Sequence, residues 1–365
     1  MMKNEEKIEK IYVLKSARKY SLTQKILKKL AAVPVETINH EEELHEIISN
    51  QADPIGAGKK NLVLKVLKGD FVKPCPCTPF YLGCNYYVIQ ADLNCPMDCT
   101  YCILQLVLNQ PWLTVHVNTE DMWAQLDSFL KANDRYLRIG TGEFGDSLAL
   151  DSLIGRSREF IEFFRKRPKA WFELKTKTVN IENILNTPSA ENIVIAWSLN
   201  SCRMAAKEEK EAPEVQDRIR AAEEVIKKGF RVAFHFDPLI IYPGWEEGYR
   251  RVIDLLMTRI DYRKIAWISL GSLRFPPDLK PVIQQRFPES RVVYQEMIKG
   301  RDGKLRYFKP LRIKLYRKIV SCFGEKRKAV PFYFCMESRE IWRKVLGEKK
   351  RGKEKIEQFL SLPPR

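Results

Sequence analysis

The sequence predicts an α/β protein built on a partial (β/α)6, TIM-like barrel, and two observations support this fold class. Short runs rich in β-branched and aromatic residues alternate with helical patterns between residues 86 and 268, and such alternation is typical of βαβ units with parallel strands. Polar residues also gather directly after several of these runs, where the functional edge of a parallel barrel lies. We therefore expect the barrel to occupy residues 80–272.

The elements of this barrel follow in chain order. The expected strands are 86–92, 136–139, 171–174, 193–197, 231–236 and 265–268. The expected helices are 103–108, 119–131, 152–166, 212–228 and 245–257. Each strand run is short and each helical pattern is longer, as expected when helices connect neighbouring parallel strands.

The segments on either side of the barrel differ from it in composition. Residues 1–79 predict a small N-terminal α/β unit, with a strand at 11–14 and a basic amphipathic helix at 22–30, followed by a linker rich in proline and cysteine. The run Gly56-Ala57-Gly58-Lys59-Lys60 lacks the full spacing of a phosphate loop, so it predicts a turn. Residues 273–365 predict a basic hairpin and helices, with a charged tail at 349–355.

Composition restricts the class of protein. The 365 residues carry 63 Lys and Arg against 46 Asp and Glu, a formal net charge of +17. Such an excess attracts polyanions, of which nucleic acid is the commonest. No apolar run is long enough for a membrane span, and the first residues form no apolar signal core. Nine cysteines in such a chain favour metal or redox work in a reducing cytoplasm over disulfides.

Three cysteines form the most informative motif. Cys95, Cys99 and Cys102 have the spacing C-x3-C-x2-C directly after the first barrel strand. A structural zinc site usually needs four nitrogen or sulfur ligands, and an iron–sulfur cluster normally takes four thiolates. Three closely spaced thiolates suit a four-iron cluster with one iron left open to a reactant. A zinc knuckle and unconnected buried thiols are the alternatives.

A second group of cysteines precedes this motif. Cys75, Cys77 and Cys84 lie in a proline-rich segment that is expected to be stiff and extended. They are compatible with a second metal site, with free buried thiols, or with a thiol that donates hydrogen.

The segment 299–318 is strongly basic and carries aromatic residues among its lysines and arginines. Asp302-Gly303 is a good two-residue hairpin turn. A basic hairpin with aromatics can straddle a nucleic-acid backbone and stack on bases. A solvated basic face with its aromatics in the core is the alternative.

The cysteine spacing, with the aromatic Tyr101 before the last cysteine, is similar to the defining motif of the radical S-adenosylmethionine (radical SAM) superfamily. The resemblance implies a [4Fe-4S] cluster held by Cys95, Cys99 and Cys102. Its unique iron would bind SAM, which one electron cleaves to a 5′-deoxyadenosyl radical. It also implies that the polar residues at successive strand ends form the SAM pocket. The expected pocket residues are Glu143, Gly145, Asp146, Lys177, Ser198, Asn200 and Asp237.

Several further motifs resemble the spore photoproduct lyase family within that superfamily. They are the hairpin Arg306-Tyr307, the run Ser198-Leu199-Asn200-Ser201, and His235-Phe236-Asp237-Pro238 before Tyr242-Pro243-Gly244-Trp245, and the similarity extends from about residue 10 to 316. The resemblance implies a carbon–carbon lyase that restores two thymines from 5-thyminyl-5,6-dihydrothymine in DNA. It further implies UV-damaged double-stranded DNA and an electron donor such as flavodoxin or ferredoxin as partners. Arg306, Tyr307, Lys309 and Arg312 would contact the DNA.

The chain departs from the family pattern at two positions. Glu143 stands where family members carry a hydrogen-donating cysteine, and Ile103 stands where they carry a tyrosine. We therefore expect Cys75 to donate the hydrogen, with Cys77 and Cys84 as the next candidates, and Tyr101 to take part in the relay. Two other functions stay open: a radical SAM enzyme for another nucleic acid or nucleotide, and a non-catalytic iron–sulfur protein that binds nucleic acid.

Overall fold

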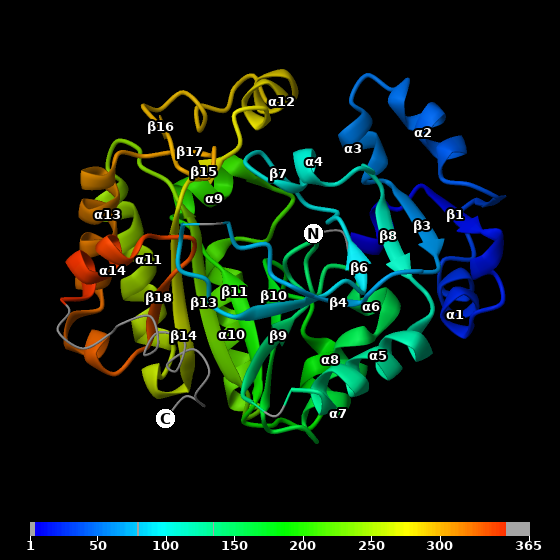
Figure 1. The fold of residues 1–365 in the computed structure, drawn as a ribbon, viewed down its shortest axis with the longest axis horizontal. Helices are drawn as coiled ribbons and strands as arrows, with labels where there is room; N and C mark the ends of the chain where they lie inside the picture. The colour runs from blue at the N-terminus through cyan, green and yellow to red at the C-terminus, as the bar shows by residue number, and fades with distance from the viewer. Residues whose placement is uncertain (1–3, 79, 134, 348–365) are drawn as a thin grey trace.

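The computed structural model describes residues 4–78, 80–133 and 135–347, and its centre is an eight-stranded sheet (Figure 1). The strand order is β18-β14-β13-β11-β10-β9-β5-β4, and only β4 runs antiparallel to its neighbour. The strands are β4 Val72–Pro74, β5 Tyr86–Ile89, β9 Leu137–Gly140, β10 Ala170–Thr176, β11 Ile193–Ser198, β13 Arg231–Leu239, β14 Ile265–Ser272 and β18 Phe332–Phe334. The six predicted barrel strands are present as β5, β9, β10, β11, β13 and β14, and they are parallel.

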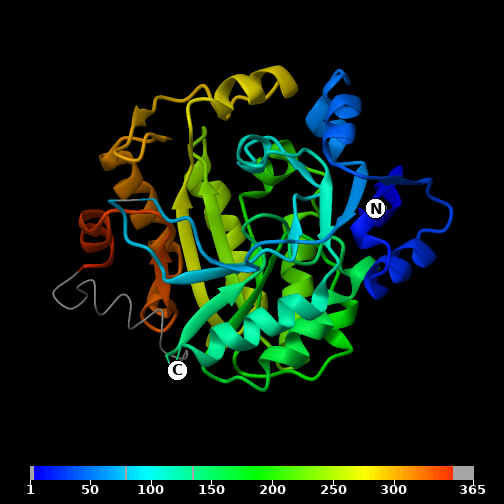
Figure 2. The same cartoon turned by 45° about the vertical axis from the view of Figure 1, so that its right-hand side comes forward.

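The helices that connect these strands pack on the outside of the curled sheet (Figure 2). They are α5 Thr119–Lys131, α6 Asp151–Ile154, α7 Arg156–Phe164, α8 Glu182–Leu185, α9 Cys202–Glu208, α10 Val215–Lys227 and α11 Trp245–Arg259. The short α4 Leu104–Val107 lies instead beside the cysteine loop, at the carboxyl ends of the strands (Figure 1). One helix expected at 152–166 is two, because Gly155 between α6 and α7 adopts a left-handed φ of 76° that a continuous helix does not allow. Phe160, Phe164 and Phe172 stack where α7 meets β10.

A second, five-stranded sheet forms the N-terminal unit, which lies on the opposite side of the molecule from the C-terminal helices (Figures 1 and 2). Its order is β2-β1-β3-β8-β6, with β1 Lys10–Leu14, β2 Val35–Ile38, β3 Asn61–Lys65, β6 Asp92–Leu93 and β8 Leu113–His116. Its helices are α1 Ser21–Lys29, α2 Glu42–Ser49 and α3 Pro54–Gly58. The expected boundary at residue 79 does not follow the sheets, because β8 comes from beyond the cysteine motif and pairs with β3.

The turn expected at 56–60 is also wrong in part. Its first three residues close the short helix α3, which begins after Asp53, whose side chain accepts a hydrogen bond from the amide of Gly56. Lys59 follows this helix and is buried.

The C-terminal region adds a three-stranded antiparallel sheet, three helices and β18. The elements are β15 Arg274–Phe275, α12 Leu279–Arg286, β16 Ile298–Lys299, β17 Leu305–Arg306, α13 Lys309–Cys322 and α14 Arg339–Leu346. The predicted hairpin is present, but its connection is the five-residue stretch 300–304 and not a two-residue turn. The sequence patterns did not predict β18. The charged tail at 349–355 lies outside the described residues.

The remaining elements are short. They are β7 Asp98–Cys99, β12 Glu209–Lys210, and the 3-10 turns Asn4–Lys7, Lys15–Ala17, Tyr262–Lys264 and Gly324–Lys328. Within the described ranges, no helix combines the length and the apolar character needed to cross a membrane.

Candidate active site at the carboxyl ends of the strands

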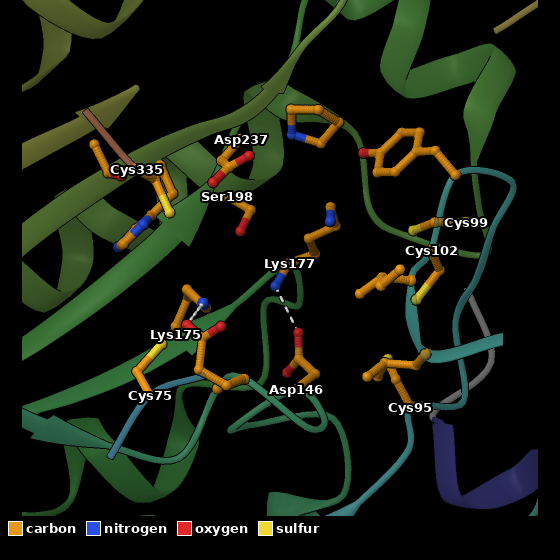
Figure 3. Close-up of a pocket in the computed structure, with 18 of the residues that line it drawn as sticks. Cys75, Cys95, Cys99, Cys102, Asp146, Lys175, Lys177, Ser198, Asp237 and Cys335 are labelled. Carbon is orange, nitrogen blue, oxygen red and sulfur yellow. Dashed lines mark hydrogen bonds and ion pairs between the residues drawn. The ribbon is translucent and has the colours of Figure 1, made fainter. Parts of the chain in front are cut away.

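A cavity of about 330 Å³ opens at the carboxyl ends of the parallel strands, between the cysteine loop and β18 (Figure 3). This volume lies at the lower end of the range for small-molecule sites. The structure brings most of the predicted site residues together here. Those that line the cavity are Cys75, Cys95, Cys99, Tyr101, Cys102, Glu143, Gly145, Asp146, Lys177, Ser198 and Asp237.

Asn94 turns the chain from the barrel into the cysteine loop. It adopts a left-handed φ of 69°, its side-chain oxygen accepts a hydrogen bond from the amide of Cys95 at 2.8 Å, and its side-chain amide donates to the carbonyl of Pro111 at 2.6 Å. Gly145 approaches it from the loop after β9. A Cβ at Gly145 would lie 2.7 Å from the carbonyl oxygen of Asn94, so this approach requires glycine.

The far side of the cysteine loop is fixed by β12. Asp98 and Cys99 pair with Glu209 and Lys210 in a short antiparallel ladder. The phenol of Tyr101 donates to the carboxylate of Glu209, which also pairs with Arg218 at 2.6 Å. Burial and the negative charge of Glu209 raise the pKa of Tyr101 well above its usual value, so the phenol keeps its proton.

The three motif cysteines are the residues that could hold a cluster, because they face one cavity from one loop. Among the described residues, no three His, Cys, Asp or Glu side chains converge on one point, as the ligands of a mononuclear site must. A four-iron cluster takes one thiolate per iron, so its ligands surround a volume and need not converge. Cys95, Cys99 and Cys102 all face the same cavity from one loop (Figure 3). Burial raises the pKa of Cys99 to about 11, although the Lys177 ammonium lowers it in part.

Asp146 organises the cavity wall opposite these thiols. Its carboxylate accepts hydrogen bonds from the Thr176 hydroxyl at 2.7 Å and from the backbone amides of Lys177 at 2.7 Å and Leu148 at 3.0 Å. It therefore ties the loop after β9 to the end of β10 (Figure 3). The ammonium of Lys177 lies 5.6 Å from the ring centre of Tyr101, on the cavity side.

Glu143 is paired within the protein. Its carboxylate accepts a hydrogen bond from Lys175, a cavity residue that was not among the expected pocket residues although it lies two positions before Lys177. Burial lowers the pKa of Lys175, but the carboxylates of Glu143 and Glu173 raise it by more. The charge of Glu143 is thus already compensated by Lys175, and its expected contact with SAM stays a prediction.

Asp237, at the end of β13, forms a bidentate pair with Arg274. The two nitrogen–oxygen distances are 2.9 and 3.1 Å, and the same guanidinium lies 3.3 Å from the sulfur of Cys335. Arg274 and Cys335 both line the cavity and were not predicted as site residues. Cys335 directly follows β18, whose three-residue aromatic run Phe332–Phe334 is too short a signal to predict a strand.

Asn200 is the one predicted cofactor residue outside the cavity lining. It is buried behind the wall, where its side-chain oxygen accepts a hydrogen bond from the Tyr249 hydroxyl at 2.7 Å and its amide donates to the Pro238 carbonyl at 3.3 Å. Its polar atoms are therefore occupied in supporting β13, and a direct contact of Asn200 with a ligand stays a prediction.

A buried ionic group forms the floor of the cavity. His235 Nε2 lies 2.8 Å from the carboxylate of Glu173, which also accepts a hydrogen bond from the Trp267 indole at 3.1 Å. The guanidinium of Arg138 lies 4.2 Å from the ring centre of Trp267. Burial alone would raise the pKa of Glu173, but the charges of His235 and Arg138 outweigh it and hold that pKa at about 2.

Three thiols outside the cluster motif also line the cavity: Cys75, Cys84 and Cys335. Burial raises the pKa of each, so each sulfur keeps its hydrogen. Cys77, one of the next candidates for hydrogen donation, lies outside the lining.

The hairpin residues differ from the expectation of a surface that touches DNA. Arg306 and Tyr307 are each 1% exposed. Arg306 pairs with Asp302 and lies 4.1 Å from the ring centre of Tyr81, while the Tyr307 hydroxyl accepts a hydrogen bond from the amide of Ile241 at 3.1 Å.

Arg312 is likewise buried and pairs with Glu337. In this structure the three side chains are buried and paired within the protein, and their contact with DNA stays a prediction. Lys309 remains half-exposed and pairs with Glu340 at 2.7 Å. The exposed side chains near the hairpin include the basic Lys299 and Arg301. Large apolar or aromatic side chains are exposed there as well: Tyr294, Ile298, Phe308 and Leu311.

Comparison with known proteins gives a consistent result. A sequence family described as spore photoproduct lyase matches residues 7–316. Spore photoproduct lyase of Bacillus subtilis (strain 168) is 25% identical over 296 residues, which cover 78% of this chain and 84% of that protein. The protein of the same name from Clostridium acetobutylicum is 22% identical over 246 residues, which cover 67% and 71%.

Solved structures agree with these sequences in fold. A structure described as spore photoproduct lyase complexed with dinucleoside spore photoproduct superposes with a TM-score of 0.80 at 22% identity, covering 89% of this chain and 98% of the other. A doubly substituted mutant of such a lyase, described with bound AdoMet and dinucleoside spore photoproduct, has a TM-score of 0.79 over the same shares. The predicted fold class is therefore confirmed as the radical SAM type.

Proposed function

Because this chain belongs to the spore photoproduct lyase family, we propose that it is a radical SAM DNA-repair lyase that returns 5-thyminyl-5,6-dihydrothymine to two thymines. The observation that carries this proposal is the cavity in which the three motif cysteines face the polar ends of β9, β10, β11 and β13. Such a pocket at the carboxyl ends of parallel strands is where an α/β barrel performs its chemistry. UV-damaged double-stranded DNA and an electron donor of the flavodoxin or ferredoxin kind are the partners this reaction needs.

The residues around the cavity have separate tasks in this proposal. Cys95, Cys99 and Cys102 would hold a [4Fe-4S] cluster, and Lys177, Ser198, Asp237 and the backbone at Gly145 would bind SAM beside it, with Asp146 keeping the loop in place. When bound, this pair supplies a 5′-deoxyadenosyl radical. The walls exclude water, which protects a radical from side reactions.

The adenosyl radical would take a hydrogen atom from the lesion, and a thiol in the cavity would return a hydrogen atom to the product radical. The sulfur-centred radical that remains would regain a hydrogen atom from 5′-deoxyadenosine. Cys75 and Cys335 are both buried and protonated, and Figure 3 shows them on different sides of the cavity. Cys75 lies on the side of the Glu143–Lys175 pair, where family members carry their donor cysteine. We assign the donation to Cys75. Cys335 is held by Arg274, and we assign it to the support of Asp237.

Access of the lesion to this cavity requires that it leave the duplex. A damaged base step costs less to unstack than an intact one, and the net charge of +17 supplies the attraction to the backbone. The exposed Tyr294 and Phe308 offer rings for stacking. We therefore assign the DNA contact to these rings and to Lys309.

The burial of Arg306 and Tyr307 favours one alternative, a radical SAM enzyme that acts on a short oligonucleotide or nucleotide and needs no hairpin inside a duplex. Comparing a dinucleotide lesion with the same lesion in a duplex separates the two functions. A DNA lyase should repair the duplex with the lower KM, because only the duplex carries enough phosphates for the net charge of +17 to attract it strongly.

The decisive experiment is anaerobic. Protein with a reconstituted cluster is mixed with SAM, reductant and an oligonucleotide that contains the lesion, and both thymine recovery and 5′-deoxyadenosine are measured. Cys75→Ala should lower thymine recovery at least about tenfold while SAM is still cleaved, because the proposed hydrogen donor is missing. A tenfold loss corresponds to about 1.4 kcal/mol of barrier. Cys202→Ala, an exposed thiol outside the cavity, is the matched control and should leave repair unchanged.

Two results would change the proposal. SAM cleavage without thymine from any lesion substrate would retain the radical chemistry and reject the substrate. Full repair by Cys75→Ala together with loss of repair in Cys335→Ala would keep the lyase and move its donor to Cys335.

A further inference from the structure

The N-terminal unit places a lysine against the back of the cysteine loop. Lys59 follows α3, and its side chain is only 7% exposed. Its ammonium donates a hydrogen bond to the carbonyl of Met97 and lies 3.2 Å from the carboxylate of Asp98. Met97 and Asp98 lie between Cys95 and Cys99, so this cation contacts the segment that carries the motif cysteines.

A second cation, which belongs to the C-terminal region, contacts the same segment. Arg286, at the end of α12, pairs with Asp98 at 2.9 Å and with Asp53 at 2.8 Å. Its guanidinium also donates to the side-chain oxygen of Gln105, whose amide donates to the carbonyls of Thr100 at 2.9 Å and Cys102 at 3.1 Å. Asp98 thus lies between two cations, and the loop is fixed by residues of the N-terminal unit and of the C-terminal region.

The burial of Lys59 calls for a reason beyond this one ion pair. Removing an ammonium from water is costly unless its charge is compensated. Asp98 is shared with Arg286, so it compensates Lys59 only in part. Ligation by Cys95, Cys99 and Cys102 would bring three thiolates to the same loop, and each reduction would add one more negative charge. The neighbouring Lys60 shows the contrast, since it is 54% exposed and pairs with Glu9 on the surface.

We propose that Lys59 is a positioning residue whose buried charge raises the reduction potential of the cluster on the Cys95–Cys102 loop, with Asp98 opposing it. This inference rests on the proposed function only in that the loop holds an iron–sulfur cluster. A nearby positive charge stabilises the reduced form, because that form carries the extra electron, and net charge is one of the quantities that set cluster potentials. Groups behind the ligands tune a metal site in this way in general.

The test is a redox titration of the reconstituted cluster, followed by electron paramagnetic resonance, without SAM or DNA. Lys59→Met keeps most of the length of the unbranched side chain and removes its charge. At a fixed potential near the midpoint, the ratio of reduced to oxidised cluster should fall about tenfold, which is a shift of ~59 mV to more negative potential for one electron. Lys60→Met removes the same charge from the neighbouring, exposed position, and its midpoint potential should equal that of the wild type.

Asp98→Asn should shift the midpoint potential in the opposite direction. It removes a negative charge from the same place, so its midpoint should become more positive, and a merely structural disturbance would not give shifts of opposite sign in the two variants. Iron and labile sulfide are measured in each protein, to compare only samples with equal cluster content.

The outcomes distinguish this inference from the function. Failure of the wild type to assemble a cluster would reject the proposed function itself. A loaded Lys59→Met protein with the wild-type midpoint would overturn the inference alone. An Asp98→Asn midpoint that is unchanged or more negative would overturn it too, even where Lys59→Met does not fold or load.

Discussion

Charged side chains buried beneath the cavity are coupled, so single residues there carry large effects on stability. Glu173 faces His235, Arg138 and Lys175, and its pKa of about 2 lies below the ordinary value of 4.5 because those positive charges outweigh its burial. A carboxylate whose pKa is lowered by folding stabilises the folded state at every pH above its ordinary pKa. That contribution decreases as the pH falls from about 4.5 and is lost as it passes through about 2.

Glu173→Gln should therefore lower the free energy of unfolding by about 3 kcal/mol at pH 7, because it leaves Arg138 without its buried counter-charge. The difference from the wild type should narrow as the pH is lowered from 4.5 towards 2. Urea denaturation at a series of pH values measures both. Glu325→Gln, on an 82% exposed side chain, is the control and should change the free energy by less than about 0.5 kcal/mol. Equal losses at all pH values would contradict the charge-based explanation.

Some residues that line the cavity could be predicted from the sequence and others could not. Cys95, Cys99, Cys102, Asp146 and Lys177 were predictable because they lie in short motifs or directly after strands. Arg274 and Cys335 were not, since their place in the cavity depends on a strand pairing across many residues. Arg306 and Tyr307 showed the reverse error: their basic and aromatic character suggested a surface, whereas Asp302 and Tyr81 bury the arginine.

At the scale of elements, the contact between the loop after β9 and the entrance to the cysteine loop decides the shape of the cavity. The two backbones meet at Gly145 and Asn94, which form a parallel bridge. The space between them is too small for a side chain, since a Cβ would lie 2.7 Å from the Asn94 carbonyl.

We expect Gly145→Ala to separate these two loops at a cost of about 1–3 kcal/mol, the usual penalty for an overpacked site. If the cavity binds SAM, the dissociation constant should rise about tenfold for each 1.4 kcal/mol that falls on the bound state. Thermal denaturation and isothermal titration with SAM measure the two effects. Gly69→Ala is the matched control, because a Cβ there would meet nothing within 4 Å. Wild-type behaviour of Gly145→Ala in both measurements would show that the loops adapt without loss.

Elements with clear periodicity were predictable, and short ones paired at long range were not. The helix expected at 119–131 is α5 Thr119–Lys131 to the residue, because its amphipathic pattern is local. β18 has only three residues, and it is a strand because β14 offers a free edge. β8 likewise joins the N-terminal sheet through β3, a pairing that no local pattern reports.

At the scale of the whole molecule, the N-terminal unit and the barrel share one interior. Ile11 of β1 belongs to a buried cluster with Leu113 and Val115 of β8 and with Leu153 and Ile154 of α6. Lys25 of α1 also donates a hydrogen bond to the carbonyl of Ile154 at 2.6 Å. The N-terminal unit is therefore no separate appendage, and it should unfold together with the barrel.

Ile11→Ala should accordingly destabilise the entire protein by about 2–4 kcal/mol, because it leaves a cavity in this shared core. The far-ultraviolet circular dichroism and the fluorescence of the barrel tryptophans should report one common midpoint, shifted to lower denaturant. Val35→Ala, at an exposed position of β2, should leave that midpoint nearly unchanged. A variant with two separate transitions, of which only the first is shifted, would show that the unit unfolds alone.

The position of β18 has a consequence for how the protein is made. The chain passes from Ser272 at the end of β14 through the whole C-terminal region before Phe332 returns to the sheet. Since a nascent chain emerges from its N-terminus and folds in that order, the barrel from β5 to β14 leaves the ribosome while its cavity still lacks the wall formed by Tyr333 and Cys335. If the motif cysteines hold a cluster, iron and sulfide would therefore reach them through this open side during translation, before residues 332–335 complete the wall.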